Sequence, residues 1–250
     1  MSHDLKLLDG AILVSDAHYN LNRECFLHFL EYLDNLEVAP PQIFMMGDMF
    51  DLLVGEVTNT KLFNSSLIKY IKSLSSKSEV IYFEGNHDFS ISLVFDNIKV
   101  FPMSAQPVRT TINDKSVLLS HGDYKVGGSY AIYSMIIRNH TLLRLLNFLD
   151  EKVNGIISSF IIKKHLDKKL CRKFDNFELN IESSLNKKFD YCIEGHYHQD
   201  VKYRFENTTY INLPAFACNQ SYITVDSQDR NNLFSKAKFK DHRCKTVMTH

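Results

Sequence analysis

The sequence lacks several features that would assign a protein to a class at once. It has no excess charge, because 29 Lys and Arg residues balance 29 Asp and Glu residues, so nothing global directs the chain to nucleic acid or to a membrane surface. No continuous apolar run approaches the ~20 residues that cross a bilayer. The first residues have no basic stretch before an apolar one, which argues against a secretory signal.

Cysteine is also sparse. The five cysteines are widely spaced and form no C-x-x-C pair: Cys25, Cys171, Cys192, Cys218 and Cys244. This pattern predicts free thiols in a reducing cytosol, with neither a disulfide framework nor a zinc ribbon. The 250 residues, 44% of them hydrophobic, are enough for one large domain with a sizeable core.

Short apolar runs that end in polar clusters organise the chain. They are rich in Val, Ile, Phe and Tyr, which is typical of buried strands. The runs with their clusters are AILVSDAH (11–18), QIFMMGD (42–48), EVIYFEGNHD (79–88), SVLLSHGD (116–123) and YCIEGHYH (191–198). Helical patterns over 23–36 and 60–74 separate the first three runs. The β-α-β-α-β alternation predicts an α/β layered fold, in which ligands bind beyond the carboxyl ends of the strands.

Other segments complete the expected organisation. Residues 100–119 predict an added hairpin that turns at Asn113 and Asp114. Residues 129–171 change to a very apolar helical pattern, at a place where an insertion would overhang the site. We therefore expect a core formed by 1–124 and 172–240, a helical lid over 125–171 and a flexible tail over 241–250.

The polar clusters contain an ordered set of metal-ligand residues. In chain order they read D-x-H (16–18), G-D-x-x-D (47–51), G-N-H-D (85–88), H-G-D (121–123) and G-H-x-H (195–198). The candidate ligands offer oxygen and nitrogen but no sulfur: Asp16, His18, Asp48, Asn86, His121, His196 and His198. Such donors suit two divalent ions such as Mn²⁺, Fe²⁺, Co²⁺ or Zn²⁺, and an ion pair clamps the attacking and leaving oxygens of phosphoryl transfer.

Each motif alone says little, because a single histidine is more often an ordinary core or surface residue. The ordered set, with every motif after a strand-like run, is far more specific. Asp51 and Asp123 are expected to orient ligands. The histidines outside the motifs are interpreted as ordinary core or surface residues: His3, His28, His140, His165, His242 and His250.

This order of motifs resembles the full motif set of the calcineurin-like metallophosphoesterases, over residues 16–198. The resemblance implies a layered α-β-β-α sandwich and two metal sites. One ion would be held by Asp16, His18, Asp48 and His198, and the other by Asp48, Asn86, His121 and His196. His87 matches the family residue that protonates the leaving oxygen or contacts the phosphate, and Asp88 matches its orienting partner. Asn86 is also a candidate substrate contact.

The expected lid carries charge of one sign. Residues 125–173 contain ten basic and three acidic residues, a net charge of +7. Basic and very apolar helices beside a phosphoesterase site suit an acylated phosphate substrate presented at an anionic bilayer. The other interpretation is a helical hairpin packed on the core with a solvated basic face.

A narrower resemblance follows from the H-G-D motif, Tyr130, Arg138-Asn139 and the helical lid, which are similar to the UDP-2,3-diacylglucosamine hydrolases of lipid A synthesis. It implies hydrolysis of a pyrophosphate to UMP and 2,3-diacylglucosamine 1-phosphate, usually with Mn²⁺. It also implies a cytoplasmic enzyme, peripheral on the inner membrane. No nucleic-acid partner is expected, because the sequence has no long basic groove pattern with interleaved aromatic residues. Tyr130 and Arg138 are its candidate substrate contacts in the lid.

The sequence departs from that family at three places. The family commonly has Arg where His87 stands, the region of Gly127 and Gly128 lacks a family Asp, and the second half of the lid does not align with the family's substrate contacts. Two alternatives therefore stay open. One is a general phosphodiesterase or phosphomonoesterase, and the other is a non-catalytic scaffold, against which the intact motifs argue.

Overall fold

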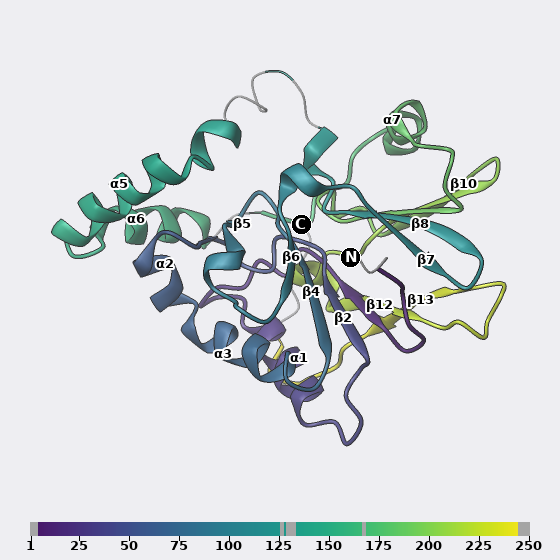
Figure 1. Ribbon diagram of the computed structural model, residues 1–250, viewed down its shortest axis with the longest axis horizontal. Coiled ribbons are helices and arrows are strands. Elements are labelled where there is room, and N and C mark those ends of the chain that lie inside the picture. The colour runs from purple at the N-terminus through teal and green to yellow at the C-terminus, as the bar shows by residue number, and fades with distance from the viewer. Residues whose placement is uncertain (1–4, 126–127, 129–133, 167–168, 245–250) are drawn as a thin grey trace.

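Two β-sheets pack face to face at the centre of the molecule (Figure 1). The computed structural model describes residues 5–125, 128, 134–166 and 169–244. The first sheet has the strand order β13-β12-β1-β2-β4-β6, the second has the order β10-β11-β9-β8-β7, and β3 pairs with β5 separately. This is the layered α/β sandwich that the sequence predicts.

The element bounds are as follows. The strands are β1 Ile12–Val14, β2 Gln42–Met45, β3 Leu53–Val54, β4 Glu79–Phe83, β5 Asp88–Phe89, β6 Lys99–Phe101, β7 Val108–Ile112, β8 Lys115–Ser120, β9 Tyr191–Glu194, β10 Val201–Phe205, β11 Thr208–Asn212, β12 Ser221–Val225 and β13 Phe234–Lys238. The α-helices are α1 Cys25–Asp34, α2 Thr58–Phe63, α3 Ser65–Leu74, α5 His140–Lys152, α6 Ile156–His165, α7 Phe177–Ser184 and α8 Phe216–Asn219. Short 3₁₀ turns are η1 Ile91–Leu93, η2 Met103–Ala105 and η3 Asp123–Lys125.

The central strands are apolar throughout because both of their faces are covered. Successive side chains of a strand point to opposite faces of the sheet. Leu13 packs between the two sheets, whereas its neighbour Val14 packs under the helical layer with Phe29 of α1 and Leu67 of α3. Helix α7 covers the outer face of the second sheet through Phe177. These packing layers explain why the sequence shows unbroken apolar runs instead of alternation.

The parallel pairing of strands brings the polar motifs together. Strand β1 pairs in parallel with β2, and β2 pairs in parallel with β4. In the second sheet, β8 pairs in parallel with β9. Since parallel strands end at the same edge of a sheet, the segments that follow these strands converge. The strands and the β7–β8 hairpin predicted from the sequence are confirmed.

One predicted helix is divided in the structure. The pattern over 60–74 predicts a single helix, but α2 ends at Phe63 and α3 starts at Ser65. The intervening Asn64 donates its side-chain amide to the carbonyls of Leu52 and Thr60, at 2.9 and 2.8 Å. Asparagine side chains commonly compete in this way with backbone hydrogen bonds.

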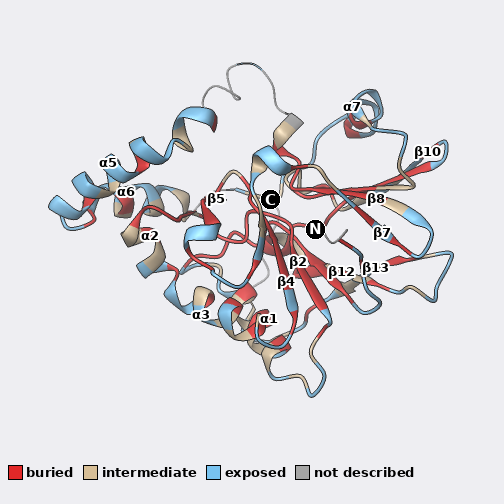
Figure 2. Cartoon of the chain, in the orientation of Figure 1, coloured by how far each residue is buried: buried red, intermediate tan, exposed pale blue. Residues whose placement is uncertain are grey.

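Helices α5 and α6 extend from the sandwich within the predicted lid segment (Figure 1). Asn59 of α2 donates to the Gly155 carbonyl and to Ser158, at 3.1 and 2.6 Å. Figure 2 shows that many residues of α5 and α6 are exposed. Phe148 and Phe160 are among their exposed side chains. Within the described ranges, every helix falls short of the combined length and apolar character that a bilayer span requires.

The expectation of free cysteines is wrong for two pairs. Cys25 of α1 is bonded to Cys244, and Cys171 is bonded to Cys218 of α8. The partners are 219 and 47 residues apart, so their spacing gives no sign of pairing. Residues 241–244 of the expected tail also contact α1, since Arg243 forms an ion pair with Glu31 at 2.8 Å. Residues 245–250 lie outside the described residues.

Candidate metal centre

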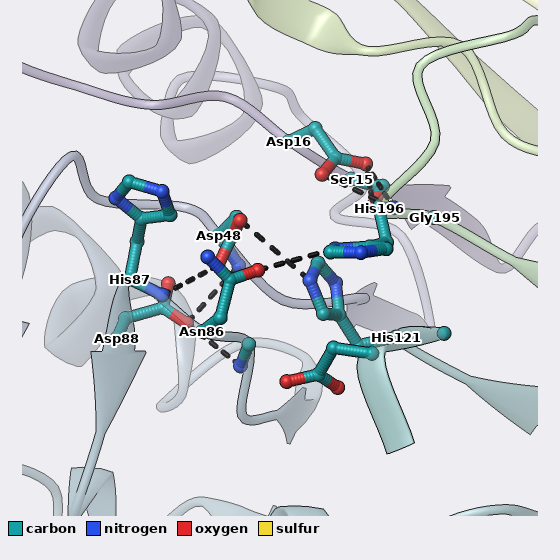
Figure 3. A network of polar contacts seen from close by, with 12 residues as sticks. Ser15, Asp16, Asp48, Asn86, His87, Asp88, His121, Gly195 and His196 are labelled. Carbon is teal, nitrogen blue, oxygen red and sulfur yellow. Dashed lines mark hydrogen bonds and ion pairs between the residues drawn. The ribbon is translucent and has the colours of Figure 1, made fainter. Parts of the chain in front are cut away.

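Two clusters of ligand atoms form where the strands end. Figure 3 shows Asp16 of the first cluster together with the second cluster. Asp16, His18 and His198 make the first cluster, in which His198 Nε2 lies 3.1 Å from Asp16 Oδ1 and 3.4 Å from His18 Nε2. Asp48, His121 and His196 make the second, and His196 Nδ1 lies 3.1 Å from Asn86 Oδ1. All seven ligands predicted from the sequence therefore belong to one site.

Asp48 lies between the two clusters. Its Oδ2 is 3.8 Å from His18 Nε2 and 3.6 Å from His121 Nε2. A carboxylate in this position can serve two cations at once, as dinuclear phosphoryl-transfer sites require. The geometry thus supports the bridging role that the family resemblance implies for Asp48.

The donor atoms of the site are better placed to bind a cation than to form hydrogen bonds with one another. His121 is fully buried, yet its Nε2 has no hydrogen-bond partner. Such an orphaned atom is costly in a folded protein unless a ligand satisfies it. Because the other donors are carboxylate oxygens, an amide oxygen and imidazole nitrogens, the residues present fit divalent first-row ions.

The imidazole rings are oriented by hydrogen bonds behind them. His121 Nδ1 faces the Met46 carbonyl at 2.9 Å, and His198 Nδ1 faces the Leu170 carbonyl at 2.7 Å. A proton on Nδ1 leaves Nε2 as the ligand atom. His18 Nδ1 lies 3.5 Å from Asp51 Oδ1, which supports the orienting role expected for Asp51.

Several ligands have backbone conformations that are uncommon for residues with a side chain. Their φ angles are positive at Asp16 (53°), His18 (43°), Asp48 (54°), His196 (64°) and His198 (57°). Such residues cost free energy unless the surrounding fold holds them, and they cluster at functional sites. Here the turn after each strand directs the side chain into the shared site.

Glycines before the ligands allow the loops to approach closely. A Cβ on Gly85 would lie 2.2 Å from Asp48 Oδ1, and one on Gly195 would lie 2.0 Å from Ser15 Oγ. Any side chain at these positions would displace the carboxylate or the Ser15 hydroxyl. The glycines of the G-N-H-D and G-H-x-H motifs are therefore needed for space.

Burial and neighbouring charges set the protonation of the ligands. Burial lowers the pKa of His18 and the pKa of His196 to about 4, so both rings are neutral near pH 7. Burial also disfavours a charged His121, but the adjacent Asp48 carboxylate outweighs it and raises the pKa of His121 well above its usual value. Asp16 raises the pKa of His198 against burial in the same way. The metal-free site therefore holds protons that a cation would displace.

His87 and Asp88 lie on the other side of Asp48 from His121 and His196 (Figure 3). The His87 ring is oriented by the Asp51 carbonyl, which faces its Nδ1 at 2.7 Å. The Asp88 carboxylate instead accepts hydrogen bonds from Tyr82 Oη at 2.6 Å and from the backbone amides of Asp48 and Gly85 at 3.0 and 2.9 Å. In this geometry Asp88 fixes the Asp48 and Gly85 loops, whereas the family resemblance implies that it orients His87.

A third group of possible ligands, His18, Asp51 and His87, has a simpler explanation. Asp51 Oδ2 is already held by Arg23 Nη2 and Asn20 Nδ2, each at 2.7 Å. We interpret this group as the network that positions His18 and His87 beside the metal clusters.

Arg138 contacts the protein around the site. It donates to the Gly85 carbonyl at 2.7 Å and to Glu84 at 3.3 Å, and its guanidinium lies 4.9 Å from the centre of the Phe89 ring. It also lies 3.6 Å from Asp123, whose pKa is raised by burial. Direct substrate contact by Arg138 stays a prediction. Tyr130, the other predicted lid contact, lies outside the described residues.

A cavity of about 460 Å³ opens beside the metal clusters, under the lid. Asn86, His87 and His165 line it together with a mostly apolar wall formed by α5, α6 and the segment around α2. Members of this wall include Leu52, Val57, Phe89, Leu142, Leu146, Ile157 and Ile161. The site can thus accept a ligand with a phosphate at one end and an apolar group at the other.

Two residues at the site are not predicted from the sequence. Arg23 is grouped with an ordinary amphipathic helix, and His165 is interpreted as an ordinary histidine. In the structure Arg23 donates to the His18 and Leu166 carbonyls, at 3.0 and 2.9 Å. The His165 ring lies 5.2 Å from the His87 ring. Neither belongs to a motif, and both reach the site through tertiary packing.

Comparisons with known proteins agree with this geometry. Residues 11–200 match the family model described as calcineurin-like phosphoesterase. A protein from Haemophilus influenzae named UDP-2,3-diacylglucosamine hydrolase is 26% identical over an alignment of 233 residues, with 90% of this chain and 97% of that protein covered. A protein of the same name from Blochmanniella floridana is 22% identical, over 84% of this chain and 88% of the relative. The chain belongs to the calcineurin-like phosphoesterase family.

Proposed function

We propose that this chain is a hydrolase that uses two metal ions to cleave UDP-2,3-diacylglucosamine into UMP and 2,3-diacylglucosamine 1-phosphate, a step of lipid A synthesis. The observation that carries the proposal is the placement of Asp48 between two ligand clusters, next to an apolar cavity that begins at Asn86 and His87. The names of the relatives from Haemophilus influenzae and Blochmanniella floridana support this choice of substrate.

The proposed cofactors are two divalent ions, with Mn²⁺ preferred and Fe²⁺, Co²⁺ or Zn²⁺ as alternatives. The cluster of Asp16, His18 and His198 would hold one ion, the cluster of Asn86, His121 and His196 would hold the other, and Asp48 would contact both. When bound, the ions would activate water and neutralise charge on the phosphoryl oxygens.

The residues around the ions would bind and orient the substrate. His87 Nδ1 donates a hydrogen bond to the Asp51 carbonyl, which leaves Nε2 to face the substrate. In the imidazolium form, which carries a second proton on Nε2, the ring would donate that proton to the leaving oxygen and become neutral. The Asn86 side chain is at the cavity and is a further candidate contact for the substrate. The mostly apolar wall would accept acyl chains and exclude water from the reacting phosphate.

The exposed side of the lid supports work at a membrane surface. Phe160 is 70% exposed, Ile156 is 66% exposed and Phe148 is 55% exposed. The basic residues Arg144, Lys152, Lys163 and Lys164 belong to the same two helices. Apolar side chains with basic neighbours are typical of peripheral binding to anionic lipids. We place the protein on the cytoplasmic face of the inner membrane, where a substrate with acyl chains would be presented.

The test compares substrates with the Mn²⁺-loaded protein. We expect turnover of bis(p-nitrophenyl) phosphate, and a higher kcat with a lower KM for UDP-2,3-diacylglucosamine. UDP-N-acetylglucosamine, which lacks the long acyl chains, should show little activity. Equal rates on both UDP-sugars would exclude the lipid substrate and favour a general phosphodiesterase. A protein inert on all three substrates would favour the non-catalytic scaffold. The Asp48→Asn variant serves as the inactive control.

A further inference from the structure

Three imidazole rings form a row from the metal clusters to the lid. The centres of the His18 and His87 rings are 4.9 Å apart, and those of His87 and His165 are 5.2 Å apart, each pair in an edge-to-face arrangement. His18 belongs to a metal cluster, while His165 is the last residue of α6. The row thus joins two parts of the chain that are more than a hundred residues apart in sequence.

The row of rings runs from the metal clusters into the lining of the cavity. His87 and His165 both line the cavity, and most of the other lining side chains are apolar. A ligand with its reacting phosphorus at the metal clusters and an apolar group in the cavity has to pass these two rings. A polar group between the phosphorus and the apolar part would lie next to His165.

The backbone at His165 is fixed to the metal centre. Arg23 Nη1 donates to the Leu166 carbonyl at 2.9 Å, and its Nη2 lies 3.4 Å from the His165 carbonyl. The same guanidinium lies 2.7 Å from Asp51 and donates to the His18 carbonyl at 3.0 Å. Because a rigid arginine fork holds both segments, the end of α6 has a defined place relative to the metal ligands.

The leaving group of the proposed reaction is itself a phosphate. Hydrolysis of the diphosphate joins the oxygen of water to the UMP phosphorus and breaks the bond to the bridging oxygen, whose electron pair stays on the acylated sugar phosphate. We propose that His165 donates a hydrogen bond to this departing phosphate, so that α6 contributes a specificity residue to the catalytic site. The inference rests on the proposed function, since a substrate without a second phosphate offers His165 no such partner.

Two substitutions separate this role from simple packing. His165→Phe keeps an aromatic ring against His87 but removes the donor, and His165→Gln keeps a donor without the ring. For UDP-2,3-diacylglucosamine we expect His165→Phe to lower kcat/KM by about tenfold or more, as the loss of a hydrogen bond to a charged group predicts. We expect His165→Gln to stay within about threefold of wild type, because it can still donate to the phosphate. Lys69→Ala, at an exposed position of α3 outside the lid, is the control.

A second substrate and a binding measurement make the test specific. Bis(p-nitrophenyl) phosphate has no second phosphate, so its turnover by His165→Phe should stay within about threefold of wild type. Inhibition by 2,3-diacylglucosamine 1-phosphate should weaken about tenfold in His165→Phe, while inhibition by UMP should not change. If the wild type is active and His165→Phe is unimpaired, the assignment of His165 is overturned but the proposed function is not. The same holds if His165→Phe loses equal activity on both substrates. A wild type that hydrolyses only the p-nitrophenyl diester would overturn the proposed substrate and, with it, this inference.

Discussion

The Asp48 carboxylate concentrates the chemistry of the site in one side chain. Its Oδ2 lies within 4 Å of imidazole nitrogens from both clusters, and its Oδ1 accepts a hydrogen bond from the His87 amide at 2.8 Å. Although burial opposes ionisation, His121 and His87 hold the pKa of Asp48 well below its usual value. The site therefore keeps a buried negative charge that attracts cations at neutral pH.

The first prediction at the residue scale concerns His87. His87→Ala should lower kcat on bis(p-nitrophenyl) phosphate by about 10²-fold, because it removes the group proposed to assist the leaving oxygen. The bound metal, measured by inductively coupled plasma mass spectrometry, should stay at the wild-type level. Loss of metal in this variant would make His87 a ligand instead. His242→Ala is the control, since that side chain is 94% exposed.

A second prediction concerns the protons held by the metal-free site. Neighbouring carboxylates raise the pKa of His121 and the pKa of His198, so both rings keep protons at pH values where free imidazole loses them. A cation must displace these protons, so its apparent affinity should fall as the pH is lowered. Calorimetric titration with Mn²⁺ in two buffers of different ionisation enthalpy should show proton release. Binding enthalpies that are equal in both buffers would contradict this protonation state.

At the scale of the elements, the lid is held to the core at several points. Arg23 holds the end of α6, Arg138 contacts the Gly85 loop shortly before α5, and Asn59 of α2 holds the α5–α6 turn. The two helices are also joined to each other, because the buried Asp150 of α5 accepts hydrogen bonds from the amides of Ile157 and Ser158 of α6, at 2.9 and 3.1 Å. The pair of helices is therefore an ordered part of the site.

Replacing Arg23 should loosen the end of α6. Arg23→Lys keeps the charge but cannot reach the carbonyls of His165 and Leu166 while it also contacts Asp51. Amides in residues 160–166 should exchange with deuterium faster in this variant, while those of β2 and β4 should not change. Arg204→Lys on β10 is the matched control, because its hydrogen bonds are local. Unchanged exchange at the end of α6 would show that other contacts hold the lid.

The sequence predicts best what depends on local pattern. The strand runs and the polar residues at their ends are visible in the chain, because period and motif spacing are local properties. Parallel pairing then brings the motifs together, so Asp16 and His198 could be assigned to one site from the family order. Arg23, His165 and the cysteine pairs could not be assigned, because their partners are set by the packing of distant segments. The division at Asn64 depends on one side chain that competes for backbone carbonyls.

At the scale of the whole molecule, charge and apolar surface gather on the lid. The net charge of the chain is zero, but residues 125–173 carry +7. The exposed apolar residues of α5 and α6 lie on the same segment, next to the opening of the cavity. This is the face that the proposed contact with an anionic bilayer would use.

Binding to anionic vesicles should depend on this exposed face of α5 and α6. Wild-type protein should bind vesicles that contain phosphatidylglycerol and release them as salt is raised, because screening weakens attraction between charges. The double variant Phe148→Ser/Phe160→Ser should bind several-fold less in a sedimentation assay, yet hydrolyse bis(p-nitrophenyl) phosphate normally. Val38→Ser is the control, as Val38 is 84% exposed and lies in the α1–β2 connection. Equal vesicle binding by both variants would argue against the lid as the membrane contact.

Anomalous diffraction from crystals soaked in Mn²⁺ would show whether two cations share Asp48, with Asp48→Asn crystals as the reference. We expect two peaks about 3.5–4 Å apart, one among Asp16, His18 and His198 and the other among Asn86, His121 and His196. Both peaks should weaken or disappear in Asp48→Asn. A single peak, or none at this site under saturating Mn²⁺, would show that Asp48 does not bridge two ions.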